Sequence, residues 1–280
     1  LSKGLHRFMR EDPTFHVRFD EVSDETIISG MGELQLDVYA ERLRREYKCT
    51  LVVDRPKVTY REAPTAESTY NYKHKKQTGG SGQYAHVIGR LIPLPDDSED
   101  DYEFENKVTG GRIPTEYIPS VDKGFQMARV KGPLAGFEIV KTKMILDDGT
   151  SHAVDSSDLA FQVCARTAFR QAFLAAKPVL LEPIMKVEIE MPMEFQGGVT
   201  GDVMSRRGLV INTEMKPHSC TLEVEVPLAN MFGYATELRS MTQGKATFSM
   251  EFLTCRRTPK AIQEEVIAEH QKEQSRAGRG

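Results

Sequence analysis

Residues 184–226 read IMKVEIEMPMEFQGGVTGDVMSRRGLVINTEMKPHSCTLEVEV. Apolar and polar residues alternate from Ile184 to Met191, which predicts a half-buried strand. A helix is expected over Glu194–Arg207, because a glycine follows it directly. Two more strands are expected at Leu209–Met215 and Thr221–Val226, paired around a Lys-Pro-His-Ser turn. The stretch therefore predicts the order strand, helix, strand, strand.

The residues that follow complete a six-element unit. A second helix is expected over Asn230–Thr242, with Gly244 as its stop, and a closing strand over Ala246–Phe252. The full order is βαββαβ, which is that of the ferredoxin-like or split βαβ unit. We expect a ferredoxin-like domain over residues 179–258 and a C-terminal helix and tail over residues 259–280.

The N-terminal 55 residues show the same order without its first strand. The expected elements are a helix that ends at Asp12-Pro13, strands at Phe15–Phe19 and Glu25–Ser29, a helix with Leu34, Val38 and Leu43 on its apolar face, and a strand at Cys49–Val53. A missing strand leaves ladder groups unpaired, so we expect residues 1–55 to form a weakened ferredoxin-like unit. The chain begins with Leu1 and enters directly on a helical pattern, so we expect it to be a piece of a longer protein.

A unit of different pattern is expected over residues 56–178. It contains a basic stretch, an acidic loop between Asp96 and Glu105, and two helical patterns. The second helical pattern carries Leu159, Val163, Ala165, Phe169, Ala172 and Phe173, with Asp155-Ser156-Ser157-Asp158 as its N-cap material. We expect this helix to anchor the sheet of the middle unit.

The basic stretch from Tyr70 to Arg90 contains no Asp or Glu and surrounds a glycine-rich tip. The candidate contact residues of the tip are Gly79, Gly80, Ser81, Gly82, Gln83 and Tyr84, with Lys73, Lys75 and Lys76 as supporting basic residues. Backbone N–H groups, lysine charge and an aromatic ring together suit contact with single-stranded or looped RNA. A solvated surface hairpin explains the same composition, and this alternative stays open. A GxGxxA match at Gly80–Ala85 lacks the strand and helix that a dinucleotide site needs.

His152 lies on a second polar loop, next to Ser151 and several aspartates. A metal or acid–base site there would need a second ligand at a convincing spacing, which the sequence does not offer. Asp155 and Ser156 are better explained as the cap of the following helix. His152 is therefore either an ordinary exposed histidine or a contact residue.

Other chemistry finds little support in the sequence. The four cysteines Cys49, Cys164, Cys220 and Cys255 are far apart and form no CxxC pair, so no zinc site or disulfide framework is indicated. No P-loop, GxSxG or HExxH motif is present, so we expect no catalytic residue, no metal site and no cofactor. No apolar stretch suggests a membrane span and no signal-peptide layout is present, so a cytoplasmic protein is expected.

Five separated motifs resemble the elongation factor G family, in that family's order. They are Ile28-Ser-Gly-Met-Gly-Glu-Leu34, Gly79-Gly-Ser-Gly-Gln-Tyr84, Val154-Asp-Ser-Ser157, Leu181-Glu-Pro-Ile-Met-Lys-Val187 and Met231-Phe-Gly-Tyr-Ala-Thr-Glu-Leu-Arg-Ser-Met-Thr-Gln-Gly244. The resemblance implies the C-terminal part of such a factor, with domain III at 1–55, domain IV at 56–178 and domain V at 179–258. The implied fold class is α+β, with two ferredoxin-like domains flanking a domain of the ribosomal protein S5 domain 2-like type.

The resemblance also implies a function. Domain IV of the family inserts its loop tips at the decoding centre and contacts the tRNA–mRNA pair during translocation; by motif, these tips are Gly79–Tyr84 and the loop with Ser151 and His152. Domain III relays between the GTPase switches and the ribosome, which would give Gly32 and Glu33 an interdomain role. The expected partners are ribosomal RNA, ribosomal proteins, tRNA and mRNA.

Two further expectations follow from the resemblance. GTP and Mg belong to a GTPase domain that this chain lacks, so the chain itself is expected not to be an enzyme. A paralogue specialised for ribosome recycling, which splits subunits together with the recycling factor, would have the same fold and remains the alternative.

Overall fold

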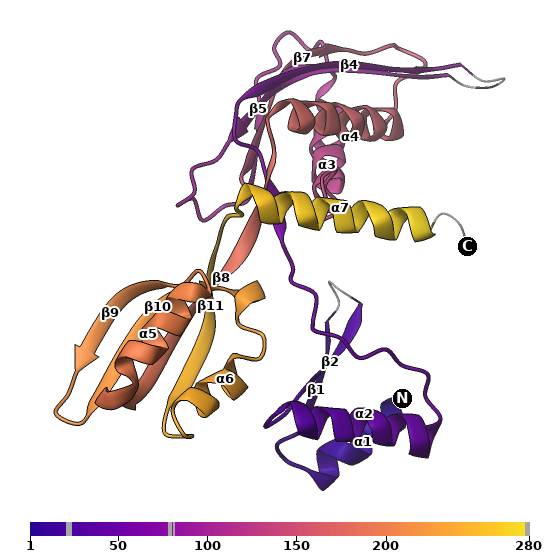
Figure 1. Cartoon of the computed structure of the whole chain (residues 1–280). Helices are drawn as coiled ribbons and strands as arrows, with labels where there is room; N and C mark the ends of the chain where they lie inside the picture. Colours follow the sequence, from indigo (N-terminus) through magenta and orange to yellow (C-terminus); the bar gives the residue numbers. More distant parts are fainter. Residues whose placement is uncertain (21–23, 78–79, 81, 278–280) are drawn as a thin grey trace. The chain divides into compact units, whose positions relative to one another are not determined.

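The computed structural model describes residues 1–20, 24–77, 80 and 82–277. The chain divides into two compact units, one made of residues 1–59 and 182–256 and the other of residues 60–181 and 257–280. Helices and strands alternate along the chain in mixed order (Figure 1), which confirms the predicted α+β class. No helix in the described part of the chain is both long and apolar enough to cross a membrane.

The N-terminal segment consists of two helices packed on a two-stranded sheet. Its elements are α1 (Ser2–Glu11), β1 (His16–Asp20), β2 (Glu25–Ser29) and α2 (Glu33–Tyr47). The two strands are antiparallel, with His16 opposite Ser29. Phe8, Phe15 and Leu43 are buried between the helices and the sheet. These four elements confirm the order predicted for this segment.

The apolar face predicted for α2 was only partly right. Leu43 is buried, but Leu34 is 78% exposed and Val38 is 50% exposed. The packed face instead includes Leu36 and Tyr39. A helix turns about 100° per residue, so Leu34, nine positions before Leu43, points to the opposite side of the helix. Spacing from Leu36 through Tyr39 to Leu43 keeps those three residues on one face.

The strand predicted at Cys49–Val53 was wrong, because this segment has irregular structure. In the six-element unit further along the chain, the last strand pairs with the first strand. No described residue of the N-terminal segment supplies that first strand, since its sheet consists of β1 and β2. The segment at 49–53 therefore lacks a partner for its backbone ladder among the described residues, and apolar, β-branched residues do not make a strand without one.

The middle of the chain forms a four-stranded sheet with two helices on one face (Figure 1). The strands are β4 (Ser68–Lys76), β5 (Gln83–Pro93), β6 (Tyr102–Asn106) and β7 (Thr142–Thr150), and they lie in the order β4-β5-β7-β6. The helices are α3 (Ile118–Arg129) and α4 (Asp158–Ala175), and a 3-10 turn, η1 (Thr115–Tyr117), precedes α3. The helix faces carry Phe125, Phe161 and Phe169, which are fully buried. As predicted, α4 anchors the sheet, although Leu159 and Val163 at its edge are exposed.

A further strand and the C-terminal helix extend this unit. β3 (Arg61–Ala63) pairs antiparallel with the first residues of β8 (Val179–Pro192), with Ala63 opposite Val179. The β8 strand thus begins earlier than the predicted Ile184. The backbone N–H of Thr258 donates to the Leu180 carbonyl at 2.9 Å, and the Leu180 N–H donates to the Gln263 side chain at 3.0 Å. These bonds fix the start of α7 (Lys260–Ala277).

All six elements of the predicted C-terminal unit are present. They are β8, α5 (Gln196–Ser205), β9 (Leu209–Met215), β10 (Ser219–Pro227), α6 (Tyr234–Met241) and β11 (Thr247–Arg257), with 3-10 turns η2 (Met193–Phe195) and η3 (Leu228–Asn230) before the two helices. The strand order β11-β8-β10-β9 is that of a ferredoxin-like sheet. Val187, Leu222 and Val224 are fully buried beneath α5 and α6. α6 begins four residues later than predicted, after Gly233 adopts a positive φ of 77°.

Candidate functional site

The end of the β4–β5 hairpin and the loop between β7 and α4 are joined by backbone hydrogen bonds. The Tyr84 N–H donates to the Asp155 carbonyl at 2.9 Å. The Ser156 hydroxyl donates to the Tyr84 carbonyl at 2.8 Å. The two loops that the resemblance singled out therefore form one structural tip. Of the predicted tip residues, Gly79 and Ser81 lie outside the described residues.

Glycine at position 82 allows the two loops to approach closely. A Cβ at Gly82 would lie 3.0 Å from the carboxylate of Asp155. That distance is shorter than ordinary van der Waals contact, so a side chain at position 82 would require the Asp155 carboxylate to move by a few tenths of an ångström. Next to it, the Gln83 amide oxygen lies 2.9 Å from His74 Nε2, which fixes the start of β5 to the end of β4.

His152 is held by its own loop and packs against Tyr84. Its backbone N–H donates to the Ser156 hydroxyl at 2.8 Å, and its Nδ1 accepts from the N–H groups of Val154 and Asp155 at 3.3 and 3.2 Å. Because Nδ1 accepts these bonds, the hydrogen of the neutral ring is on Nε2. The side chain is 54% exposed, and its ring centroid lies 6.1 Å from that of Tyr84.

The cap of α4 lies within the predicted stretch Asp155–Asp158. It is Ser157, whose hydroxyl accepts from the Ala160 N–H at 3.1 Å. The narrower assignment of the cap to Asp155 and Ser156 was wrong, because their polar groups bond to Tyr84 and His152 instead. All four residues of the stretch suit a cap by type, and only the loop geometry decides among them.

The lysines add uncompensated positive charge beside this tip. Lys73 lies opposite His86 in the β4–β5 register, and Lys75 lies opposite Tyr84, so the four side chains share one face of the sheet. This face is the one away from α4, because the alternate residues, including Tyr70, Ala85 and Val87, face the buried core. Within the described residues no carboxylate forms an ion pair with Lys73, Lys75 or Lys76, and all three lysines are exposed.

A chain of polar side chains crosses three strands of the same face. His86 Nε2 lies 2.8 Å from Asn71 Oδ1, and His86 Nδ1 lies 3.0 Å from the Thr150 hydroxyl. The Thr150 hydroxyl lies 2.7 Å from the Tyr84 hydroxyl. Burial lowers the pKa of His86, with a further lowering from the charge of Lys73. Sequence reasoning missed this chain because its members are far apart in the sequence.

The predicted relay residues lie elsewhere in the fold. Gly32 is the residue before α2 and Glu33 is the first residue of that helix. They belong to the N-terminal segment, and the tip belongs to the other compact unit. The structure therefore does not group them with the tip, and their interdomain role stays a prediction.

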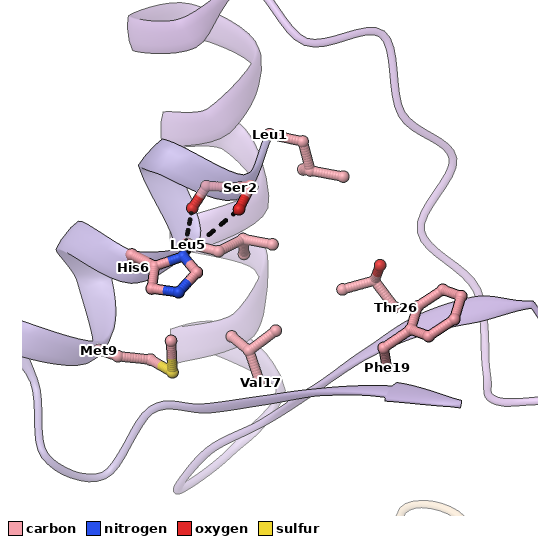
Figure 2. Close-up of a pocket in the computed structure, with 8 residues that line it drawn as sticks. All are labelled: Leu1, Ser2, Leu5, His6, Met9, Val17, Phe19 and Thr26. Atoms are coloured by element: carbon pink, nitrogen blue, oxygen red, sulfur yellow. Dashed lines mark hydrogen bonds between the residues drawn. The ribbon is translucent and has the colours of Figure 1, made fainter. Parts of the chain in front are cut away.

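A pocket of about 300 Å³ lies in the N-terminal segment (Figure 2). Its lining is mostly apolar and consists of Leu1, Ser2, Leu5, His6, Met9, Val17, Phe19 and Thr26. His6 Nδ1 is already bonded to the Ser2 carbonyl at 2.8 Å. Figure 2 shows α1 on one side of the pocket and the β1–β2 sheet on the other. The lining contains no carboxylate, lysine or arginine, so it resembles an uncovered part of the core.

Metal and thiol chemistry gain no support from the described residues, which contain no group of three or more potential metal ligands. The four cysteines are free thiols. Cys164 is buried under the hairpin, where its thiol donates to the carbonyls of Tyr72 and Ala85 at 3.4 Å. Burial raises the pKa of this thiol to about 12, so it stays protonated and inert at neutral pH.

Comparison with known proteins covers nearly the whole chain. Residues 1–55 match Elongation Factor G, domain III; residues 56–177 match Elongation factor G, domain IV; and residues 179–266 match Elongation factor G C-terminus. Elongation factor G of Rhodopirellula baltica is 57% identical over 98% of this chain, and Elongation factor G 1 of Treponema pallidum is 52% identical over 97% of it. This chain spans 39% of the length of either relative.

A solved structure agrees with these matches. A crystal structure of a protein from Thermus thermophilus is 36% identical and superposes with a TM-score of 0.85, covering 97% of this chain and 40% of that one. These matches confirm the fold class expected from the motifs, including the type of the middle domain. The chain belongs to the elongation factor G family and corresponds to its domains III and IV and its C-terminal domain.

Proposed function

We propose that this chain is the ribosome-binding arm of a translation elongation factor. In this proposal, the tip formed by the β4–β5 hairpin end and the His152 loop contacts the tRNA–mRNA pair at the decoding centre and promotes translocation. The observation that carries the proposal is the junction of Tyr84 with His152 and Ser156 beside lysines that form no ion pair with any described residue.

The chemistry of the tip suits RNA. His152 presents an exposed ring whose Nε2–H has no hydrogen-bond partner among the described residues, so this group is free to donate to RNA. The Tyr84 ring beside it offers a surface on which a base can stack, a contact worth roughly 1–3 kcal/mol per base. Lys73 and Lys75 lie on the adjacent sheet face, where they can neutralise phosphates.

The hydrogen bonds between the loops matter because they order the tip before binding. Tyr84 and Asp155 are joined through main-chain groups, and the Ser156 hydroxyl adds a bond to the Tyr84 carbonyl, so the position of His152 relative to Tyr84 does not depend on side-chain rotation alone. A tip ordered in advance loses less conformational entropy when it meets RNA. Gly32 and Glu33 would act separately, as a relay to the GTPase domain of the whole factor, where GTP and Mg would bind. Ribosomal RNA and proteins would be the partners of the arm, in the cytoplasm.

The test uses the full-length factor on programmed ribosomes. The change His152→Ala should slow translocation at least about fivefold, because a hydrogen bond and a ring contact worth roughly 1 kcal/mol or more are lost. Ribosome-stimulated GTP hydrolysis should stay near the wild-type rate. His218→Ala, at an exposed turn outside the tip, is the matched control. Unchanged translocation by His152→Ala would contradict the proposal.

A second measurement separates translocation from ribosome recycling. The factor is incubated with post-termination complexes and the recycling factor, and subunit splitting is followed by light scattering. A protein that splits subunits but does not advance tRNA would be a recycling paralogue. A protein that advances tRNA supports the proposed role directly.

A charge test addresses the lysines. The double change Lys73→Gln and Lys75→Gln should weaken binding to ribosomes and make it less sensitive to salt. Each lost phosphate contact should reduce the slope of log affinity against log salt by roughly 0.7, the value for single strands. Lys123→Gln on α3, where the lysine is also exposed, is the control. An unchanged slope in the double variant would exclude these lysines from the contact.

A further inference from the structure

With Asn71 Oδ1 facing His86, the polar chain from Asn71 through His86 and Thr150 to Tyr84 has one consistent direction. Asn71 Oδ1 can only accept, so His86 Nε2 must donate to it at 2.8 Å. In the neutral ring Nδ1 then carries no hydrogen and accepts from the Thr150 hydroxyl at 3.0 Å. Thr150 has a single hydroxyl hydrogen, so its oxygen must accept from the Tyr84 hydroxyl at 2.7 Å.

The direction fixes what the Tyr84 hydroxyl can offer to a partner. Its hydrogen points inward to Thr150, so only its lone pairs remain for an outside group. The opposite direction would place the unprotonated Nε2 of His86 against Asn71 Oδ1, two acceptors at 2.8 Å, unless the Asn71 amide turned to present its Nδ2. The inward direction is the one that fits the amide as it stands.

The surroundings of His86 keep its ring neutral near pH 7. Lys73 faces it from β4, and its charge together with burial holds the pKa of His86 below the ordinary 6.5. Asp148 on β7 acts in the opposite sense, but its carboxylate is engaged by Arg112 and by the Gly149 N–H. Among the described residues, Tyr84 on its own strand and Lys75 on β4 lie on the same sheet face as His86.

We propose that His86 and Thr150 are positioning residues that set the Tyr84 hydroxyl as a hydrogen-bond acceptor for a 2′-hydroxyl of RNA. Phosphate oxygens are acceptors and cannot bond to an acceptor-only group. The free amine N–H groups of paired adenine and cytosine lie in the deep, narrow major groove of A-form RNA, whereas the 2′-hydroxyl is a donor that every nucleotide displays in the wide minor groove. Phosphates are then left to Lys73 and Lys75. This inference rests on the proposed RNA contact and adds which RNA group Tyr84 recognises.

The first experiment needs no ribosome. Long-range ¹H–¹⁵N correlation on the histidine-labelled 280-residue chain reports the tautomer of His86. The Nε2–H form should dominate above pH 7, Thr150→Ser should keep it, and Thr150→Val should shift the Nδ1 signal. A dominant Nδ1–H form, or a Thr150→Val spectrum identical to wild type at His86, would overturn the direction of the chain.

The second experiment measures translocation by the full-length factor. Tyr84→Phe and Thr150→Val should each slow translocation about fivefold, the usual size for one hydrogen bond, and Thr150→Ser should restore the rate. Thr69→Val, at an exposed position of β4, is the control and should have no effect. Protonation of His86 at lower pH places a hydrogen on Nδ1, which then donates to the Thr150 hydroxyl and leaves that hydroxyl to donate to Tyr84. Wild type should therefore lose translocation rate as the pH falls through the pKa of His86, and Tyr84→Phe should not.

Modified RNA tests the partner group. Placing 2′-deoxynucleotides in the translocated codon, or in the anticodon of its tRNA, should slow wild type in at least one case and should not slow Tyr84→Phe further. Equal slowing of both proteins in both cases would exclude the 2′-hydroxyl. If His152→Ala slows translocation and Tyr84→Phe does not, this inference fails while the proposed function stands. If neither variant has an effect, the proposed function fails as well.

Discussion

Residues 1–59 and the six-element unit from β8 to β11 share the order helix, strand, strand, helix, but they are stabilised differently. The six-element unit has four paired strands and a core of fully buried aliphatic side chains such as Ile189 and Leu222. The N-terminal segment has two paired strands and a small aromatic core around Phe8 and Phe15. Its uncovered side is the apolar pocket of Figure 2.

Polar contacts reinforce the N-terminal segment. Asp12 accepts from the Thr14 hydroxyl at 2.6 Å, from the Gln35 amide at 2.6 Å and from the Tyr39 hydroxyl at 2.9 Å. Arg42 lies over the Phe8 ring, 4.3 Å from its centroid, and bridges carboxylates of both helices. The local sequence pattern is therefore enough to form the helices and the hairpin of this segment, whereas a further strand needs a neighbouring strand to pair with.

Proline substitutions give the largest expected contrast between the two regions. Val224 lies in β10 between β8 and β9, so Val224→Pro removes a ladder hydrogen bond from a central strand and should cost more than about 3 kcal/mol. Val52 is 93% exposed, and no described residue accepts from its N–H. Val52→Pro should change the free energy of unfolding by less than about 1 kcal/mol. Hydrogen exchange of each region measures both, and equal losses would refute the contrast.

Truncation of apolar side chains should give a smaller difference in the same direction. Leu222 is fully buried, so Leu222→Ala should reduce the free energy of unfolding of the C-terminal unit by about 2–5 kcal/mol. Leu34 is 78% exposed, and Leu34→Ala should stay within about 0.5 kcal/mol. Urea unfolding followed by hydrogen exchange tests both variants. A large loss in Leu34→Ala would show that α2 buries the face that the sequence predicted.

The fold was largely predictable because most elements have a clear local period. Alternation in β10 and the glycine stops after α5 and α6 located the C-terminal unit. The failures depended on partners that are remote in sequence. Cys49–Val53 is apolar and β-branched as many strands are, but pairing is a property of two segments. The extension of β8 back to Val179 likewise depends on β3, more than 100 residues earlier.

The candidate site was less accessible to sequence reasoning. Composition indicated a basic glycine tip, and only family motifs linked it to the His152 loop. The physical link is the set of hydrogen bonds that Ser156 and Asp155 make with Tyr84, and nothing in the local sequence distinguishes these two residues from helix caps. The chain through Asn71 and Thr150 requires the strand register, which a single sequence does not give.

The pH dependence of stability in the N-terminal segment tests the contribution of Asp12. Hydrogen bonds, chiefly from Thr14, lower the pKa of Asp12 from 3.8 to about 2. Because the folded-state pKa is depressed, its contribution is present above pH 4 and is lost as the pH falls from about 4 toward 2. The backbone amides of α1 and α2 should lose protection from hydrogen exchange as the pH falls through this range. In Asp12→Asn, this protection should depend less on pH. A dependence equally steep in Asp12→Asn would assign it to other carboxylates.

The ion pairs on α1 and α2 should make the smallest contribution to the free energy of unfolding. Arg42 Nε lies 2.7 Å from Glu46 Oε1 one helical turn away, and both side chains remain partly exposed. Exposed pairs at this spacing contribute only about 0.3–0.5 kcal/mol, because water and salt screen them. A double-mutant cycle with Arg42→Met and Glu46→Gln should find a coupling of that size that vanishes in about 1 M salt. Arg42→Met alone should cost more than the coupling, since its guanidinium also covers Phe8. A coupling well above about 1 kcal/mol would mean that charge, rather than the aromatic core, stabilises the segment with the fewer strands.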